Sequence, residues 1–162
     1  MALWYKSSYF SSHFILFSAL GITIQTDFSY MLISRFVSLY AVPSGILLSY
    51  MHYLPIHWIE SIVASVIGYS FFYIINKIFY VIKKQDGMGQ GDFDLMALIG
   101  AYTGLLGIWF TVLIGSLLGT TVSILYIIYK KSRITHVPFG PYLSIGAITF
   151  VLCRSFIIHY ML

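Results

Sequence analysis

Five acidic residues occur in the 162 residues of this chain, and three of them lie within residues 85–94, "QDGMGQGDFD". Asp27 ends the first apolar run of the chain, and Asp92 opens a later one. Two carboxyl groups that lie close together can share one proton, so that one acts as a base and the other as an acid. Asp27 and Asp92 are therefore a candidate paired-carboxylate site, provided that the fold brings them together.

Each acidic residue also has a purely structural interpretation. An aspartate just before an apolar helix is a favoured N-cap, and its charge suits the helix dipole, which fits both Asp92 and Asp94. Asp86 fits a solvated loop, and Glu60 fits the first turn of a helix. Spacing alone leaves both the capping and the catalytic interpretation of Asp92 open.

The composition indicates which elements must position these side chains. The chain is 59% hydrophobic and 9% charged, whereas soluble domains carry roughly 25% charged residues. We therefore predict an all-α, polytopic membrane protein in which residues 1–162 form a single domain with about six transmembrane helices. The predicted spans are roughly residues 11–26, one within 36–59, 58–82, two within 95–129 that join at Gly104-Leu-Leu-Gly107, and 140–160.

The basic residues predict the orientation of these spans. An N-terminus outside the cell places most of them in the inner loops, as the positive-inside rule requires. Asp27 and Asp92 then lie at the same, cytoplasmic boundary. The net charge of +4 follows mainly from this bias, so membrane lipid is expected as a partner and nucleic acid is not. The inner-loop residues are Arg35, Lys83, Lys84, Lys130, Lys131 and Arg133.

Small residues predict where helices pack closely. In lipid, helices associate through small residues four positions apart. Three pairs have this spacing, and we interpret them as packing faces of the third to fifth spans: Ala64 and Gly68, Gly100 and Gly104, and Gly115 and Gly119.

Neither a metal site nor a cofactor is expected. The single cysteine, Cys153, excludes an internal disulfide and argues against a zinc-cysteine site. The histidines are scattered along the chain, at His13, His52, His57, His136 and His159.

Three motifs in order resemble the type IV prepilin peptidases, a family of membrane aspartic proteases. "GMGQGD" at residues 87–92 resembles the Gly-x-Gly-Asp signature of that family. "TDFSYMLISRFVSLYAVPSG" at residues 26–45 is similar to the first catalytic segment, and "PFGPYL" at residues 138–143 to the start of the last span. Together these motifs cover most of the chain.

The resemblance implies that Asp27 and Asp92 are the catalytic aspartates of an endopeptidase. Its substrate would be a prepilin or pseudopilin, cut after a short basic leader at the cytoplasmic face of the bacterial inner membrane. Gly87, Gly89 and Gly91 would form a supporting loop that lets backbone and substrate approach Asp92 closely. Pro138, Gly140 and Pro141 would contribute to the wall of the active site.

The chain departs from the family pattern at several positions. It has one cysteine instead of a cysteine tetrad, so we expect a peptidase without the N-terminal methyltransferase region of many relatives. Ser34 follows Ile33 where relatives have proline, and Arg35 replaces an acidic residue or asparagine. Asp94 stands where relatives often have lysine. These changes leave room for a slow, specialised or inactive member.

Two other classes of function fit a small apolar protein. One is a non-catalytic family member that binds pilin-like partners, and the other is a small transporter. A transporter should carry polar residues at mid-membrane in broken helices, whereas the acids here gather at one face. Within the enzyme class, cleavage of archaellin-like or other signal sequences is a further alternative.

Overall fold

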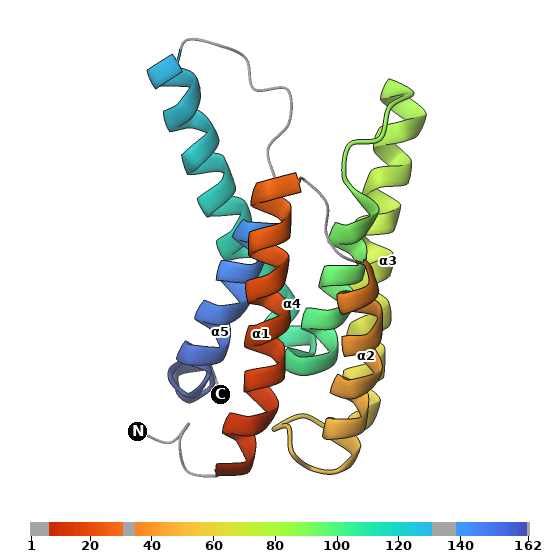
Figure 1. Cartoon of the computed structure of the whole chain (residues 1–162), viewed down its shortest axis with the longest axis vertical. Coiled ribbons are helices and arrows are strands. Elements are labelled where there is room, and N and C mark those ends of the chain that lie inside the picture. The colour runs from red at the N-terminus through yellow and green to blue at the C-terminus, as the bar shows by residue number, and fades with distance from the viewer. Residues whose placement is uncertain (1–6, 31–34, 131–138, 162) are drawn as a thin grey trace.

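The computed structural model describes residues 7–30, 35–130 and 139–161, and most of these residues are helical (Figure 1). No strand occurs in these three ranges, which confirms the all-α fold class. The helices are α1 (Ser7–Tyr30), α2 (Arg35–Tyr50), α3 (Trp58–Lys83), α4 (Gln90–Lys130) and α5 (Gly140–Met161).

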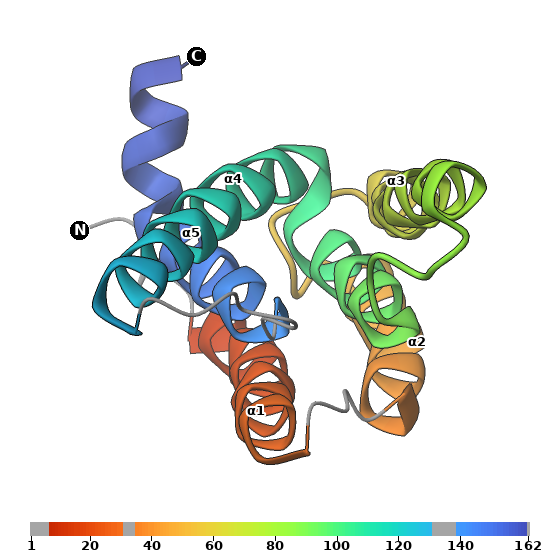
Figure 2. The ribbon, with the colours of Figure 1, turned by 90° about the horizontal axis from the view of Figure 1, so that it is seen from above.

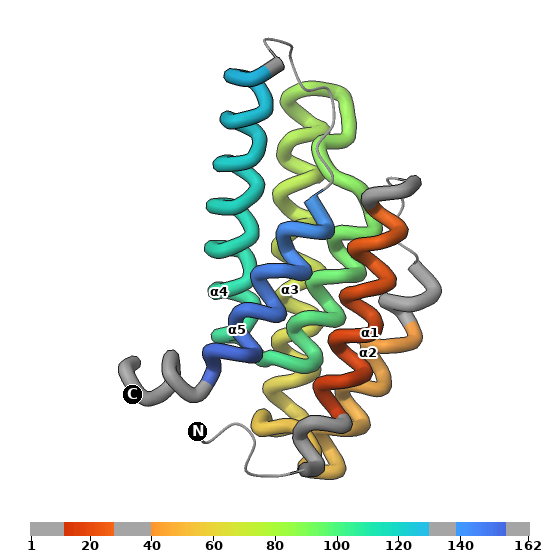
Figure 3. Tube along the Cα trace, turned by 60° about the vertical axis from the view of Figure 1, so that its left-hand side comes forward, coloured from red at the N-terminus to blue at the C-terminus, as the bar shows by residue number. Residues whose placement is uncertain are grey.

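Helix α4 changes direction at Gly104. This residue has φ 75° and ψ −172°, a conformation that is essentially restricted to glycine. The chain descends along the first half of α4, turns, and returns along the second half (Figures 1 and 3). The sequence predicted two segments joined at Gly104-Leu-Leu-Gly107, and the break at Gly104 confirms that division.

Two stretches of the described residues are long and apolar enough to cross a membrane. They are Trp58–Lys83 and Gln90–Tyr129, and the second of them contains the break at Gly104. The apolar stretch Gly140–Arg154 is shorter. The helical segments follow the predicted pattern, whereas six membrane crossings stay a prediction.

The first half of α4 forms the centre of the bundle. Every residue from position 92 to position 104 is buried, as expected for a helix that is apolar on all sides. This half lies beside α2 and α3, which Figure 2 shows from above. Its fully buried large side chains are Leu95, Met96, Leu98, Ile99 and Tyr102.

Large apolar side chains cover the outside of α3 and of the second half of α4. An exposed apolar surface of this size is typical of a protein that faces lipid or a partner. Strongly exposed examples are Val66, Ile78, Val81, Ile82, Trp109, Leu117, Leu125, Ile128 and Tyr129.

Glycines let α3 approach the first half of α4 closely. A Cβ atom on Gly68 would lie 2.6 Å from the backbone oxygen of Met96, and one on Gly100 would lie 2.6 Å from the backbone oxygen of Ala64. The two helices therefore touch backbone to backbone, which confirms Ala64, Gly68 and Gly100 as packing positions. Gly115 packs against α5 in a similar way.

Candidate active site

Asp27 lies in the last part of α1 and is buried, with 5% of its surface exposed. Its carboxyl interacts with the backbone N–H of Gly140, the first residue of α5. The first N–H groups of a helix have no partner within that helix. Asp27 therefore supplies, from a different helix, an acceptor for the start of α5.

Asp92 lies in the first turn of α4 and is 6% exposed. Its carboxyl interacts with the backbone N–H of Gly89, and its own N–H donates to the Gly89 carbonyl at 3.1 Å. Asp92 is therefore the third residue of α4 and not the N-cap, and its side chain reaches back to the residue before the helix as in a capping box. The capping and catalytic interpretations of Asp92 are thus compatible with each other.

The fold brings together Asp27, which lies near the start of the first motif along the chain, and Asp92, which ends the second motif. The Asp27 carboxyl acts electrostatically on that of Asp92. Asp27 Oδ2 and Asp92 Oδ1 are both buried, and neither has a hydrogen-bond partner in the described structure. Buried carboxyl oxygens are costly to leave unpaired, so these two oxygens are unusual and call for an explanation.

The predicted supporting loop lies between α3 and α4. Gly87 packs on the ring of Phe79, since a Cβ there would lie 2.7 Å from a ring carbon. At Gly89 the neighbour nearest to an added Cβ is Asp92 Oδ2, at 3.8 Å. Gly91 lies in the first turn of α4. Gly89 of this loop thus borders Asp92 directly, whereas a role of the loop in substrate approach stays a prediction.

The predicted wall residues lie at the start of α5. Gly140 interacts with Asp27, as described above. Pro141 is buried in the first turn of α5, where a proline is favoured because its missing N–H would have no partner there. Pro138 lies outside the described residues, as do Ile33 and Ser34.

Comparison with known proteins identifies the family. The model of the type IV leader peptidase family matches residues 14–124, a stretch that includes both Asp27 and Asp92. The chain belongs to the type IV leader peptidase family. No solved structure gives a significant match to it.

Several curated relatives in this family are prepilin leader peptidase/N-methyltransferases. That of Xanthomonas campestris pv. campestris is 37% identical over 87 residues, which are 53% of this chain and 30% of the relative. That of Pseudomonas putida is 35% identical over 88 residues, which are 54% of this chain and 31% of the relative. That of Pseudomonas aeruginosa is 32% identical over 88 residues, 54% and 30% of the two chains. The matches therefore span about 30% of the length of these relatives.

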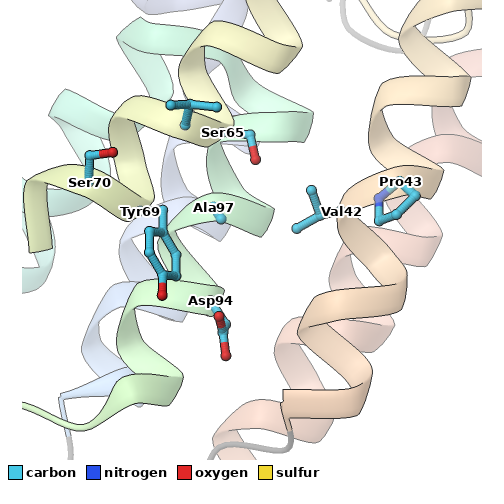
Figure 4. Close-up of a pocket in the computed structure, with 8 residues that line it drawn as sticks. Val42, Pro43, Ser65, Tyr69, Ser70, Asp94 and Ala97 are labelled. Atoms are coloured by element: carbon cyan, nitrogen blue, oxygen red, sulfur yellow. The ribbon is translucent and has the colours of Figure 1, made fainter. Parts of the chain in front are cut away.

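Asp94 has surroundings that differ from those of Asp27 and Asp92, since it lines a cavity that neither of them lines. It lines a cavity of about 410 Å³ between α2, α3 and α4 (Figure 4). Side chains two positions apart on a helix point in different directions, which separates Asp94 from Asp92. Its neighbours in the cavity are Val42, Pro43, Ser65, Val66, Tyr69, Ser70 and Ala97.

The other acidic residues have structural surroundings. Glu60 lies in the first turn of α3, as predicted. Its carboxyl contacts Gly104 and so lies beside the break in α4. Asp86 accepts a hydrogen bond from Asn76 Nδ2 at 3.3 Å. Within the three described ranges, no group of three His, Cys, Asp or Glu side chains could hold a metal ion.

Asn76 was not among the predicted residues, although its side chain makes three hydrogen bonds to the glycine-rich loop. A signal was present, since Asn76 is the only asparagine in the chain and interrupts an apolar helix. A lone amide in such a position needs hydrogen-bond partners. The sequence does not say which residues these partners are.

Proposed function

We propose that this protein is a membrane aspartic endopeptidase that removes the leader peptide from prepilin- or pseudopilin-like precursors. The observation that carries the proposal is the juxtaposition of Asp27 and Asp92, each with one buried carboxyl oxygen that lacks a partner. Membership of the type IV leader peptidase family supports the same activity. The whole chain would act as one membrane-embedded peptidase domain.

The chemistry follows from two neighbouring carboxyl groups. One carboxylate accepts a proton from water as the water oxygen attacks the carbonyl carbon of the scissile bond. The other carboxyl group donates its proton to the amine nitrogen as the C–N bond breaks. Two such groups titrate as a pair, so neither aspartate is assigned a fixed role. The peptide bond is hydrolysed without a cofactor in this scheme.

Orientation in the membrane determines which peptides can reach the site. The proposal places the N-terminus outside, six helical segments across the bacterial inner membrane, and the glycine-rich loop in the cytoplasm. The basic loop residues support this orientation. Asp27 and the loop that precedes Asp92 then face the side on which a precursor carries its basic leader.

The decisive experiment is processing of a prepilin in membranes, with the parent compared with Asp27→Asn and Asp92→Asn. Asparagine keeps an oxygen that can accept the N–H of Gly140 or Gly89, so both variants should fold. Neither can serve as a proton donor or base like a carboxyl group, and we expect cleavage to fall by at least about 100-fold.

Asp94→Asn is the matched control, because Asp94 lies in the same helix and lines the cavity between α2, α3 and α4, of which Asp92 is not a lining residue. We expect this variant to cleave at the parental rate. Parental cleavage by Asp27→Asn or Asp92→Asn would contradict the two-aspartate mechanism. A folded parent that binds a prepilin without cutting it would instead identify a non-catalytic, pilin-binding family member.

A further inference from the structure

Asn76 lies in α3 among exposed apolar side chains. Its neighbours Ile74, Ile75 and Ile78 are each more than 40% exposed. An amide among apolar groups is costly unless its donors and acceptor have partners. The partners of Asn76 all come from the loop that leads to Asp92.

Three hydrogen bonds join the Asn76 side chain to three consecutive loop residues. Asn76 Oδ1 accepts from the backbone N–H of Gly87 at 2.9 Å and from that of Met88 at 3.1 Å. Asn76 Nδ2 donates to Asp86 Oδ1 at 3.3 Å. One side chain thus satisfies two loop amides and fixes the direction of a third residue.

A second contact holds the loop against the same face of α3. Phe79 is three residues from Asn76, so the two side chains lie on one face of the helix. Gly87 packs on the Phe79 ring with no room for a Cβ. Lys84, at φ 56°, ends α3 in a left-handed conformation, and the loop then returns beside α3 (Figure 1).

The anchored residues lead directly to the candidate catalytic aspartate. Gly89 follows Met88, its N–H interacts with the Asp92 carboxyl, and its carbonyl accepts the Asp92 N–H. A displacement of Gly87 and Met88 therefore moves the groups that orient Asp92. We propose that Asn76 is a positioning residue, which fixes the loop so that Gly89 orients the Asp92 carboxyl toward Asp27.

This role rests on the proposed function and predicts a specific kinetic effect. Asn76 is bonded to the loop and not to Asp92, so its loss should misplace the carboxyl without removing it. Misplacement of a reacting group by about 1 Å can cost about 100-fold in rate. We expect kcat to fall by about tenfold to 100-fold, with KM little changed.

The test compares three changes in the full-length protein. Asn76→Ala removes the anchor, and Asn76→Asp places two carboxylates side by side. The double variant Asn76→Asp/Asp86→Asn exchanges the two groups, so that a carboxylate accepts the Gly87 and Met88 N–H groups and also the new amide at position 86. Lys77→Ala is the control, because Lys77 is exposed on α3 and its side chain lies over Tyr73.

Two measurements are made on each variant: kcat and KM for prepilin cleavage, and hydrogen–deuterium exchange of the peptide that covers Gln85 to Gly91. Loss of two hydrogen bonds should speed exchange at Gly87 and Met88 by about tenfold. We expect fast exchange and low kcat for Asn76→Ala, which loses the acceptor, and for Asn76→Asp, in which repulsion between the carboxylates at positions 76 and 86 pushes the loop away from α3. The double variant and Lys77→Ala should match the parent in both measurements.

Unchanged exchange in Asn76→Ala would overturn the anchor itself. Faster exchange with parental kcat would overturn the positioning role. If Asn76→Ala fails to fold, the pair Asn76→Asp and Asn76→Asp/Asp86→Asn decides, since a positioning role requires the second to recover kcat. A parent that cleaves no prepilin would overturn the proposed function and the positioning role together, and the exchange data would still report on the anchor.

Discussion

Both candidate catalytic aspartates are oriented by backbone N–H groups of glycine. Gly140 begins α5 and interacts with Asp27, while Gly89 precedes α4 and interacts with Asp92. The partial positive charge at a helix start favours a carboxylate there. In each carboxyl group one oxygen is left without a partner, and in the proposed mechanism this is the oxygen that reacts.

We expect this arrangement to require the short side chain of Asp92. Asp92→Glu retains a carboxyl group but moves it one methylene further from the Gly89 N–H. We expect cleavage to fall by about 100-fold with little change in thermal stability in detergent. Asp94→Glu is the matched control, because its side chain lines a cavity of about 410 Å³. Equal losses in both variants would contradict the distinction between the two aspartates.

At the residue scale, motifs in the sequence pointed to Asp27 and Asp92 but not to Asn76, which holds the loop before Asp92. Asp27 and Asp92 were predicted by motif, and the structure places them together. The contacts of Asn76 join residues ten to twelve positions apart in sequence. Such a contact depends on how the loop folds back on α3, which no residue spacing encodes.

The elements are held together by close backbone contact between α3 and the first half of α4. Gly68 and Gly100 lie on the two facing surfaces, each against a backbone carbonyl of the other helix. Because backbone cannot move away as a side chain can, the interface has no room for even one methyl group.

A methyl group at this interface should therefore destabilise the protein. We expect Gly100→Ala to lower the free energy of unfolding by about 1–3 kcal/mol, measured by thermal unfolding in detergent. Gly21→Ala is the control, because an added Cβ there would meet no atom within 4 Å. That change should be neutral or slightly stabilising, since alanine favours a helix. Similar losses in both variants would contradict the packing explanation.

At the scale of the elements, the approximate ends of the helices were predictable from hydropathy and from the polar, glycine and proline residues that interrupt the apolar runs. The expected spans 58–82 and 140–160 correspond closely to α3 and α5. The expected start at residue 95 was late, because α4 begins at Gln90. Capping by Gly89 and Asp92 adds a polar first turn, and a count of apolar residues does not detect such a turn.

At the scale of the whole molecule, the sequence could not predict which apolar helix lies inside. The first half of α4 is buried on all sides, whereas α3 exposes large apolar side chains. Lipid tails and a protein interior are similarly apolar, so hydropathy does not distinguish a lipid-facing helix from a central one. Only the packing of the helices together makes that distinction.

Orientation in the membrane is testable with single cysteines. The Cys153→Ser variant is free of cysteine. In this background, Met51→Cys and Gln85→Cys place one thiol before and one thiol after α3, both at exposed positions. We expect an impermeant thiol reagent to label Met51→Cys on intact cells and Gln85→Cys in inverted vesicles. The opposite pattern would reverse the orientation. Labelling of both from one side would mean that α3 does not cross.

The break at Gly104 leaves the first half of α4 shorter than the hydrocarbon core of a bilayer. From Gln90 to Gly104 the helix rises by only about 21 Å, at 1.5 Å per residue, whereas the hydrocarbon core is about 30 Å thick. If the turn at Gly104 reaches the outer surface of the membrane, Asp92 lies within the hydrocarbon core, short of the headgroups on the cytoplasmic side. We then expect short-chain lipids, which reduce this mismatch, to bring water and the scissile bond to Asp92 more readily than long-chain lipids.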